Sequence, residues 1–166
     1  SGSLYPSGFR LKPLSADRVP VVREPIQRSP GLHSPSWIDP TYGTRIYKVT
    51  DASDFPGAGH VRHNYSRRQA FNADNSRFLA LSSNGFWLLY NATTFERLRR
   101  GGQSGALSNL AGDAEAIWHP TDPRLLWYTS INGGLVWWEK DVESDSDAVM
   151  ADFRKRLPWP GATSVW

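Results

Sequence analysis

Short apolar runs, bounded by polar or glycine-rich turns, predict β-strands along most of the chain from residue 37 onward. Residues 44–50 alternate between apolar and polar positions in the manner of a half-buried strand. Residues 86–90 and 135–138 are instead continuous apolar runs, and 95–98 reads as an edge strand with charged positions. The pattern therefore predicts many short strands.

An internal repeat organises these strands. Residues 70–81 and 117–128 both contain an aromatic residue, a polar turn with aspartate, an arginine and an apolar strand, at an offset of 47 residues. An Asn-Gly pair follows each copy, at Asn84-Gly85 and at Asn132-Gly133. Such a pair between apolar runs is a strong hairpin signal, because both residues tolerate positive φ. The repeated unit is therefore predicted to contain a hairpin.

Three or four antiparallel strands in about 47 residues is the size of a β-propeller blade. The predicted fold is all-β, with consecutive four-stranded antiparallel blades in residues 37–166, about three in number. Residues 1–36 contain six prolines and five basic residues and are predicted to form an extended arm. Within the blade region, 141–156 has the composition of one short helix.

The predicted number of blades is small for a propeller, because propellers have roughly four to eight blades. We therefore expect a partial propeller, which is either a fragment of a larger one or a chain whose ring is closed by a second chain. A small open stack of sheets is the structural alternative. Residues 158–166 look like a strand that begins a further unit.

Composition excludes several other classes. Eight Trp among 13% aromatic residues are not typical of a disordered chain, and the absence of cysteine excludes a disulfide framework. No apolar run reaches the roughly 18 residues of a membrane span, so no membrane span is predicted. Nucleic acid is not an expected partner either, because the aromatic residues lie in apolar strands and are not interleaved with basic residues.

Charge is distributed unevenly along the chain. The overall formal charge is +3, but residues 1–100 carry a net +7 and residues 101–166 a net −4. This asymmetry would attract an anionic partner to the first part of the chain. Two ordinary solvated faces would give the same counts.

Polar side chains of possible chemical use concentrate in residues 60–69, which do not recur in the second unit. The equivalent place, 112–116, reads Gly-Asp-Ala-Glu-Ala. If 60–69 continues as a strand, its side chains alternate, so that at most one of Arg67 and Arg68 faces a given cleft.

A motif that begins in this stretch resembles secreted β-propeller polysaccharide lyases of the ulvan lyase and oligogalacturonate lyase kind. The resemblance extends over about residues 37–140, and the strings 41–44 and 121–123 fit it as well. The motif reads His63-x-Tyr65-Ser66-x-x-Gln69-x-x-Asn72-x-Asp74-x-Ser76.

The resemblance implies a lyase that cleaves a uronate-containing anionic polysaccharide by β-elimination, in a secreted or periplasmic location. A base removes the proton at C5 of the uronate, and an acid, often a tyrosine, protonates the leaving oxygen. Fixed positive charge from arginine or a metal stabilises the developing enolate.

Site residues follow from the same resemblance. His63 matches the histidine of the motif, as base or carboxylate partner, while Tyr65 follows it and Tyr128 is the candidate acid. The second histidine of the family pattern has no counterpart in 82–85, where this chain reads Ser-Ser-Asn-Gly. His60 would have to replace it. Binding of the substrate is assigned to Arg67, Gln69, His60 and Asn84.

No metal site and no cofactor are predicted from the spacing. The pair His60-x-x-His63 offers two imidazole ligands to a divalent metal, but His119 or His33 would have to complete the set through the fold. A surface or strand-start role for these histidines remains the simpler interpretation. Asn64 and Asn91 lie in glycosylation sequons, which matter only in a secreting eukaryotic host.

A second function class is a non-catalytic propeller that serves as a binding or scaffold module and assembles with partner chains. A propeller supports either class, so the fold cannot choose between them. Convergence of His63, Tyr65, Arg67 and Tyr128 around a solvent-filled cleft would favour the lyase.

Overall fold

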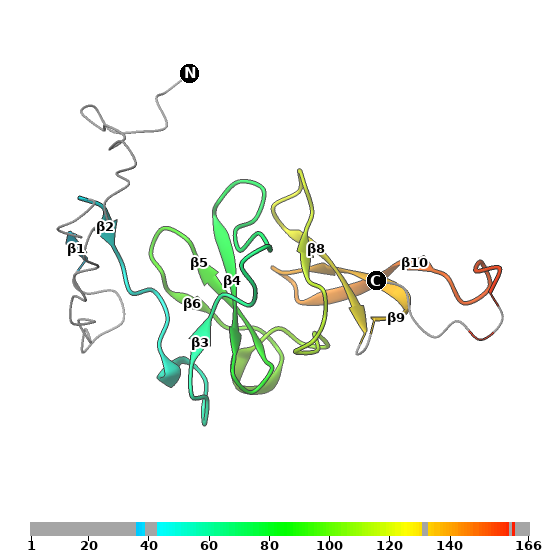
Figure 1. Cartoon of the computed structure of the whole chain (residues 1–166), viewed down its shortest axis with the longest axis horizontal. Coiled ribbons are helices and arrows are strands. Elements are labelled where there is room, and N and C mark those ends of the chain that lie inside the picture. Colours follow the sequence, from blue (N-terminus) through cyan, green and yellow to red (C-terminus); the bar gives the residue numbers. More distant parts are fainter. Residues whose placement is uncertain (1–35, 39–42, 131–132, 160, 162–166) are drawn as a thin grey trace, which may run out of the picture.

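A computed structural model describes residues 36–38, 43–130, 133–159 and 161, and shows two consecutive four-stranded antiparallel sheets (Figure 1). The predicted arm lies outside the described residues except for Ser36, and so does Asn132 of the second predicted turn. A short two-stranded sheet precedes the two larger ones. The all-β class and the four-stranded antiparallel blades predicted from the repeat are confirmed.

The strands of each sheet follow one another along the chain. The first sheet, in green in Figure 1, has the order β3-β4-β5-β6, and the second, in yellow to orange, has the order β7-β8-β9-β10. The strands are β1 Trp37–Ile38, β2 Arg45–Ile46, β3 Val61–Arg62, β4 Arg77–Ser82, β5 Trp87–Asn91, β6 Arg97–Leu98, β7 Ile117–Trp118, β8 Leu125–Ser130, β9 Gly133–Asp141 and β10 Ser146–Asp152. Two short 3₁₀ helices complete the elements, η1 Ala52–Asp54 and η2 Gln103–Gly105.

Two local predictions were wrong. The helix expected in 141–156 is the strand β10, because its backbone pairs antiparallel with β9 from Ser146 opposite Asp141 to Asp152 opposite Val136. This ladder outweighs the modest helix propensity of the segment. The strand expected at 44–50 is limited to β2, whose partner β1 is only two residues long.

A hydrophobic core joins the two sheets. Leu79, Trp87 and Leu89 of the first sheet pack in one buried cluster with Leu126 and Tyr128 of the second. This is the contact that two successive blades make in a propeller, so one face of each sheet is buried against the other.

The opposite face of the first sheet is also covered within the chain. Phe78, Leu88 and Tyr90 form a second buried cluster with Phe55, and Val49 packs against it. The segment that leads into β3 therefore covers the face that the second sheet does not reach, which gives the first sheet two buried faces.

A capping box holds this covering segment in place. The Asp51 side chain accepts hydrogen bonds from the Ser53 N–H at 3.0 Å and the Ser53 hydroxyl at 3.0 Å, while Asp54 accepts from the Asp51 N–H at 2.9 Å. Buried Asp54 also accepts a hydrogen bond of 2.7 Å from the Tyr90 hydroxyl. The η1 turn is thereby fastened to β5.

Acid is expected to loosen this turn. The pKa of Asp51 falls from 3.8 to about 2, mainly through its hydrogen bond with Lys48 and also through Ser53. A lowered pKa means that the ionised carboxylate contributes stability above its unfolded value near 3.9, and that this contribution is lost as the pH falls from about 4 to about 2. NMR titration of the Asp51 carboxyl carbon should give the midpoint near 2, and a midpoint near 3.9 would contradict the hydrogen bonds of Asp51 with Lys48 and Ser53.

Candidate functional site

The unrepeated stretch 60–69 contains β3 and the first part of the loop from β3 to β4, where the first sheet meets the second. Only Val61 and Arg62 pair with β4, opposite Ser82 and Leu81. The chain then turns, and the Arg68 N–H donates to the Tyr65 carbonyl at 3.0 Å. The expected alternation of side chains along this stretch was therefore wrong, because most of it is not a strand.

A hollow of about 230 Å³ lies at the start of this loop. The hairpin after β4 builds one side of it: the Ser83 N–H donates to the His60 carbonyl at 2.9 Å, and the Gly59 N–H donates to the Ser83 hydroxyl at 2.8 Å. Both histidines of the His-x-x-His pair line this hollow. Its lining residues are His60, Arg62, His63, Asn64, Leu81, Ser82, Ser83 and Gly85.

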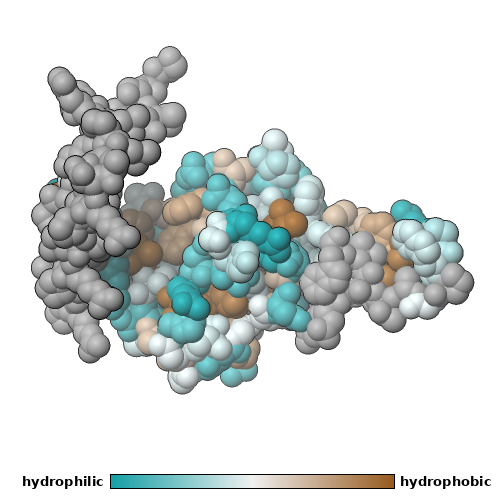
Figure 2. All heavy atoms as spheres, in the orientation of Figure 1, coloured by the Kyte–Doolittle hydropathy of each residue, from teal (hydrophilic) through white to brown (hydrophobic). Residues whose placement is uncertain are grey.

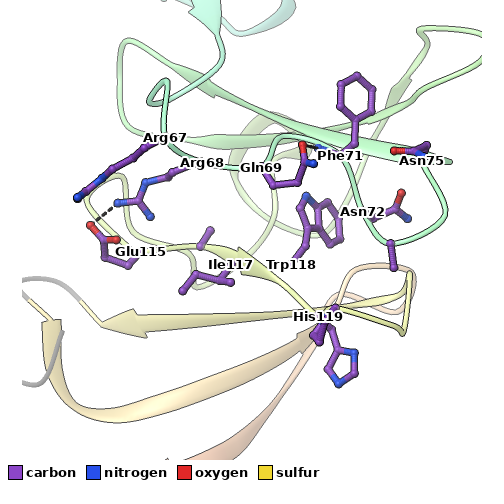
Figure 3. Close-up of a pocket in the computed structure, with 13 residues that line it drawn as sticks. Arg67, Arg68, Gln69, Phe71, Asn72, Asn75, Glu115, Ile117, Trp118 and His119 are labelled. Atoms are coloured by element: carbon purple, nitrogen blue, oxygen red, sulfur yellow. Dashed lines mark hydrogen bonds and ion pairs between the residues drawn. The ribbon is translucent and has the colours of Figure 1, made fainter. Parts of the chain in front are cut away.

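A larger groove of about 500 Å³ lies between the two sheets (Figure 3). One wall comes from the loop and the turn before β4, and the other from residues 115–120 around β7. The walls are joined where the Trp118 indole N–H donates to the Ala70 carbonyl at 2.9 Å and the Asn72 amide donates to the Pro123 carbonyl at 2.8 Å. Its polar lining residues are Arg67, Arg68, Gln69, Asn72, Asn75, Glu115 and His119, and its apolar ones include Phe71, Ile117 and Trp118.

Arg67 and Arg68 both line this groove, contrary to the expectation that only one would, because the backbone turns between Tyr65 and Arg68. Arg68 forms an ion pair with Glu115, which the dashed line in Figure 3 marks. Arg67 is exposed and lies over the Tyr65 ring, with its guanidinium carbon 5.2 Å from the ring centroid. The two arginines therefore differ: Arg68 is neutralised, and Arg67 is not.

Two arginines beside the groove and the hollow carry unpaired positive charge. The side chains of Arg62 and Arg67 form no hydrogen bond or ion pair in the part of the chain that the structure describes, and both are exposed. Most other described arginines are held by a carboxylate or a carbonyl. Those bound by carboxylates are Arg68, Arg77, Arg100, Arg124 and Arg154.

The remaining predicted site residues are dispersed. Gln69 lines the groove, and its side-chain oxygen accepts from the Phe71 N–H at 3.3 Å. Tyr65 is 56% exposed. Asn84 lies at the hairpin tip beside the hollow, and its amide donates to the Pro56 carbonyl at 3.4 Å.

Tyr128 lies apart from this surface. It is buried in the core between the sheets, and its hydroxyl donates to Asp147 at 2.9 Å. Burial, with the hydrogen bond to Asp147, raises the pKa of this phenol above its ordinary value of 10.0. The structure does not bring Tyr128 to His63, and Tyr128 lines neither the groove nor the hollow.

Sequence reasoning missed several residues of this surface. Arg62 lies inside the unrepeated stretch, and its position beside His63 was the signal that could have identified it. Glu115 and His119 join the groove only through the approach of the second sheet. His119 also has a local role, because its Nδ1 accepts from the Asp122 N–H at 2.9 Å.

The described residues contain neither a metal-binding cluster nor a membrane-spanning helix. Within residues 36–38, 43–130, 133–159 and 161, no group of three or more His, Asp or Glu side chains is arranged to hold a metal ion. Among the same residues, no helix has the length and apolar character needed to cross a membrane.

Comparison with known proteins gave a partial likeness to a solved structure. No protein-family model and no curated protein matches the chain. Among solved structures, the crystal structure of an oligogalacturonate lyase from Vibrio parahaemolyticus is similar to it, with a TM-score of 0.46 and 16% sequence identity. The match covers 73% of this chain and 30% of the lyase chain, so this chain spans less than a third of that protein.

Proposed function

We propose that this chain is part of a carbohydrate-active β-propeller that binds a uronate-containing anionic polysaccharide across the groove and the hollow. The observation that supports this proposal most is the exposed, unpaired charge of Arg62 and Arg67 beside both depressions. Guanidinium groups suit carboxylates because their N–H donors match the two oxygens. A polymer with regularly spaced carboxylates would contact both arginines.

Neighbouring side chains offer a sugar ligand an aromatic ring for stacking and amide groups for hydrogen bonds. Phe71 is 41% exposed at the groove and offers a ring face for stacking. Gln69 and Asn75 line the same groove with amide groups that can hydrogen-bond hydroxyls. A groove with aromatic and amide groups beside free arginines favours an acidic saccharide over a neutral one.

Lyase chemistry is the finer part of the proposal. His63 is assigned as the base that removes the C5 proton, with Arg62 or Arg67 neutralising the uronate carboxylate so that the enolate is stabilised. Tyr65, which solvent reaches, is assigned as the acid in place of buried Tyr128. A polysaccharide substrate also agrees with the secreted or periplasmic location expected from the sequence.

Binding without chemistry is the second candidate, and one observation favours it. No described residue hydrogen-bonds the His63 side chain, whereas a general base is normally oriented by another group. The same surface would then serve a non-catalytic binding module, as the sequence alternative proposes.

The binding proposal predicts a selective loss in arginine variants. Replacing Arg67 by glutamine should weaken binding of polygalacturonate about tenfold or more, because a charge-assisted hydrogen bond contributes about 1.5–3 kcal/mol. Isothermal titration calorimetry measures the affinity, with Arg62→Gln as the parallel variant. Arg154→Gln is the matched control, since Arg154 is also exposed but is bound by Asp152. Equal affinity in Arg67→Gln and the control, or equal binding of neutral dextran, would overturn the proposal.

The catalytic assignment is tested separately. The ultraviolet absorbance of unsaturated uronate is followed on a panel of uronate polymers, with wild type beside His63→Ala and His60→Ala. The lyase proposal expects product with wild type and its loss in His63→Ala. If the arginine variants confirm binding but wild type forms no product on any polymer, the non-catalytic module is the correct function.

A further inference from the structure

The Arg68 side chain has a single partner in the described part of the chain. Its guanidinium forms an ion pair with Glu115, and no other hydrogen bond or ion pair holds it there. Arg77 is held more firmly, because it binds Glu143 at 3.1 Å and also donates to the Ser76 carbonyl at 3.0 Å. Breaking one contact is therefore enough to free the Arg68 guanidinium.

The ion pair with Glu115 leaves one donor of Arg68 unsatisfied. The Nε–H of this side chain is buried and has no hydrogen-bond partner among the described residues. A buried donor without an acceptor costs free energy. A carboxylate that meets Nε and one terminal nitrogen of the guanidinium together would form two parallel hydrogen bonds. The contact with Glu115 is therefore not the most favourable one that a carboxylate can make with Arg68.

Solvent reaches this ion pair from the groove. The side chains of Arg68 and Glu115 are 15% and 29% exposed, and both line the groove. Figure 2 shows strongly hydrophilic atoms beside a small hydrophobic patch in the middle of the molecule, where the two sheets of Figure 1 meet. An ion pair that water can screen contributes little stability. A second carboxylate can therefore compete with Glu115 for Arg68.

The two walls of the groove do not depend on the ion pair. They are also joined by the hydrogen bonds from Trp118 to the Ala70 carbonyl and from Asn72 to the Pro123 carbonyl. Trp118 is buried in the core between the sheets as well. Release of Arg68 from Glu115 would therefore leave the groove assembled.

We propose that Glu115 is an internal competitor of the ligand: its carboxylate occupies Arg68 in the free chain and is displaced by a carboxylate of the bound polysaccharide. Arg67, which is already free, binds a first uronate, and Arg68 binds a second one in the same groove. Glu115 thereby sets the affinity of the groove for polymers with several carboxylates. This inference rests on the polysaccharide proposal and adds the residue that regulates its groove.

Replacing Glu115 by glutamine should strengthen binding of polygalacturonate about fivefold, because the amide keeps the size of the side chain but does not hold Arg68 by charge. Isothermal titration calorimetry measures the affinity. Asp152→Asn is the matched control: it also removes a carboxylate paired with an arginine and changes the net charge equally, but it lies outside the groove. The control should bind as wild type does.

A double variant tests whether Glu115 acts through Arg68. Adding Glu115→Gln to Arg68→Gln should produce little of the gain that Glu115→Gln produces alone, because the guanidinium that Glu115 occupies is then absent. An equal gain in both backgrounds would show that Glu115 only repels the ligand, and would overturn the displacement. Circular dichroism confirms that each variant is folded.

NMR of the Glu115 carboxyl carbon detects the displacement in the wild-type chain. Saturating trigalacturonate should move this resonance toward its position in Arg68→Gln, where no guanidinium holds the carboxylate. If wild type binds but the resonance stays in place, or if Glu115→Gln binds no more tightly than Asp152→Asn, this inference is wrong and the proposed function stands. If neither wild type nor Glu115→Gln binds polygalacturonate, both are wrong. Binding by Glu115→Gln alone would support the competition.

Discussion

Replacing Lys140 by methionine is expected to lower the free energy of unfolding by about 3–5 kcal/mol, because it breaks a buried ion-pair network by removing one partner. The Lys140 side chain is fully buried, and its Nζ lies 2.8 Å from Asp147 and 3.0 Å from Asp145. Burial by itself would raise the pKa of Asp145, but hydrogen bonds from Ser108 and Lys140 hold it below its usual value of 3.8. Without the ammonium group, the two partly buried carboxylates keep their other hydrogen-bond donors but lose the cation between them.

Urea denaturation followed by circular dichroism measures this loss. Arg154→Met is the matched control, because it also removes a cation paired with an aspartate, but at a side chain that is 65% exposed. The control should change stability far less than Lys140→Met, because solvent screens an exposed ion pair. Adding Asp145→Asn to Lys140→Met should recover part of the loss, since it removes one uncompensated charge. Equal effects of Lys140→Met and Arg154→Met would contradict the buried network.

Trp118→Ala is expected to have the second large effect, a loss of about 3–5 kcal/mol of stability. Trp118 is only 7% exposed, belongs to the core between the sheets and donates to the Ala70 carbonyl. The substitution creates a cavity at the contact of the two blades and leaves that carbonyl without its indole donor. Because Trp118 lines the groove, affinity for an acidic saccharide should fall as well.

Two further variants separate these contributions. Trp118→Phe keeps much of the packing but removes the N–H donor, and should cost about 1–3 kcal/mol. Trp159→Ala truncates a tryptophan that is 66% exposed, and should change stability by less than about 0.5 kcal/mol. Thermal unfolding measures all three. A Trp118→Ala protein as stable as Trp159→Ala would show that the two sheets do not depend on each other.

Apolar runs and turn residues predicted the strands and hairpins well where they were typical of only one structure. Gly85 has φ of +83°, and the turn that contains it joins β4 to β5 as the Asn-Gly signal indicated. The repeat predicted that the second unit would resemble the first, and both are four-stranded antiparallel sheets. Composition gave the wrong secondary structure for residues 146–152. Ala, Val and Met occur in both helices and strands, and pairing with the partner strand β9 makes this segment a strand.

The sequence indicated where polar side chains gather but not how they are arranged. The unrepeated stretch lines the two depressions. The sequence did not predict that Arg67 and Arg68 share a groove, since this depends on a turn, nor that Glu115 neutralises Arg68 across 47 residues of chain. Tyr128 was selected by residue type, whereas its burial depends on how the two sheets pack.

The sequence by itself determined the all-β class, the four-stranded repeat and the region where polar residues depart from that repeat, because these follow from local periodicity and turn chemistry. Only the tertiary structure decided which arginines keep a free charge and which of Tyr65 and Tyr128 is buried. Such properties depend on contacts between residues far apart in the chain. Arg62 and Arg68 show the difference: both are arginines of one stretch, but only Arg68 meets a carboxylate when the second sheet packs beside the first.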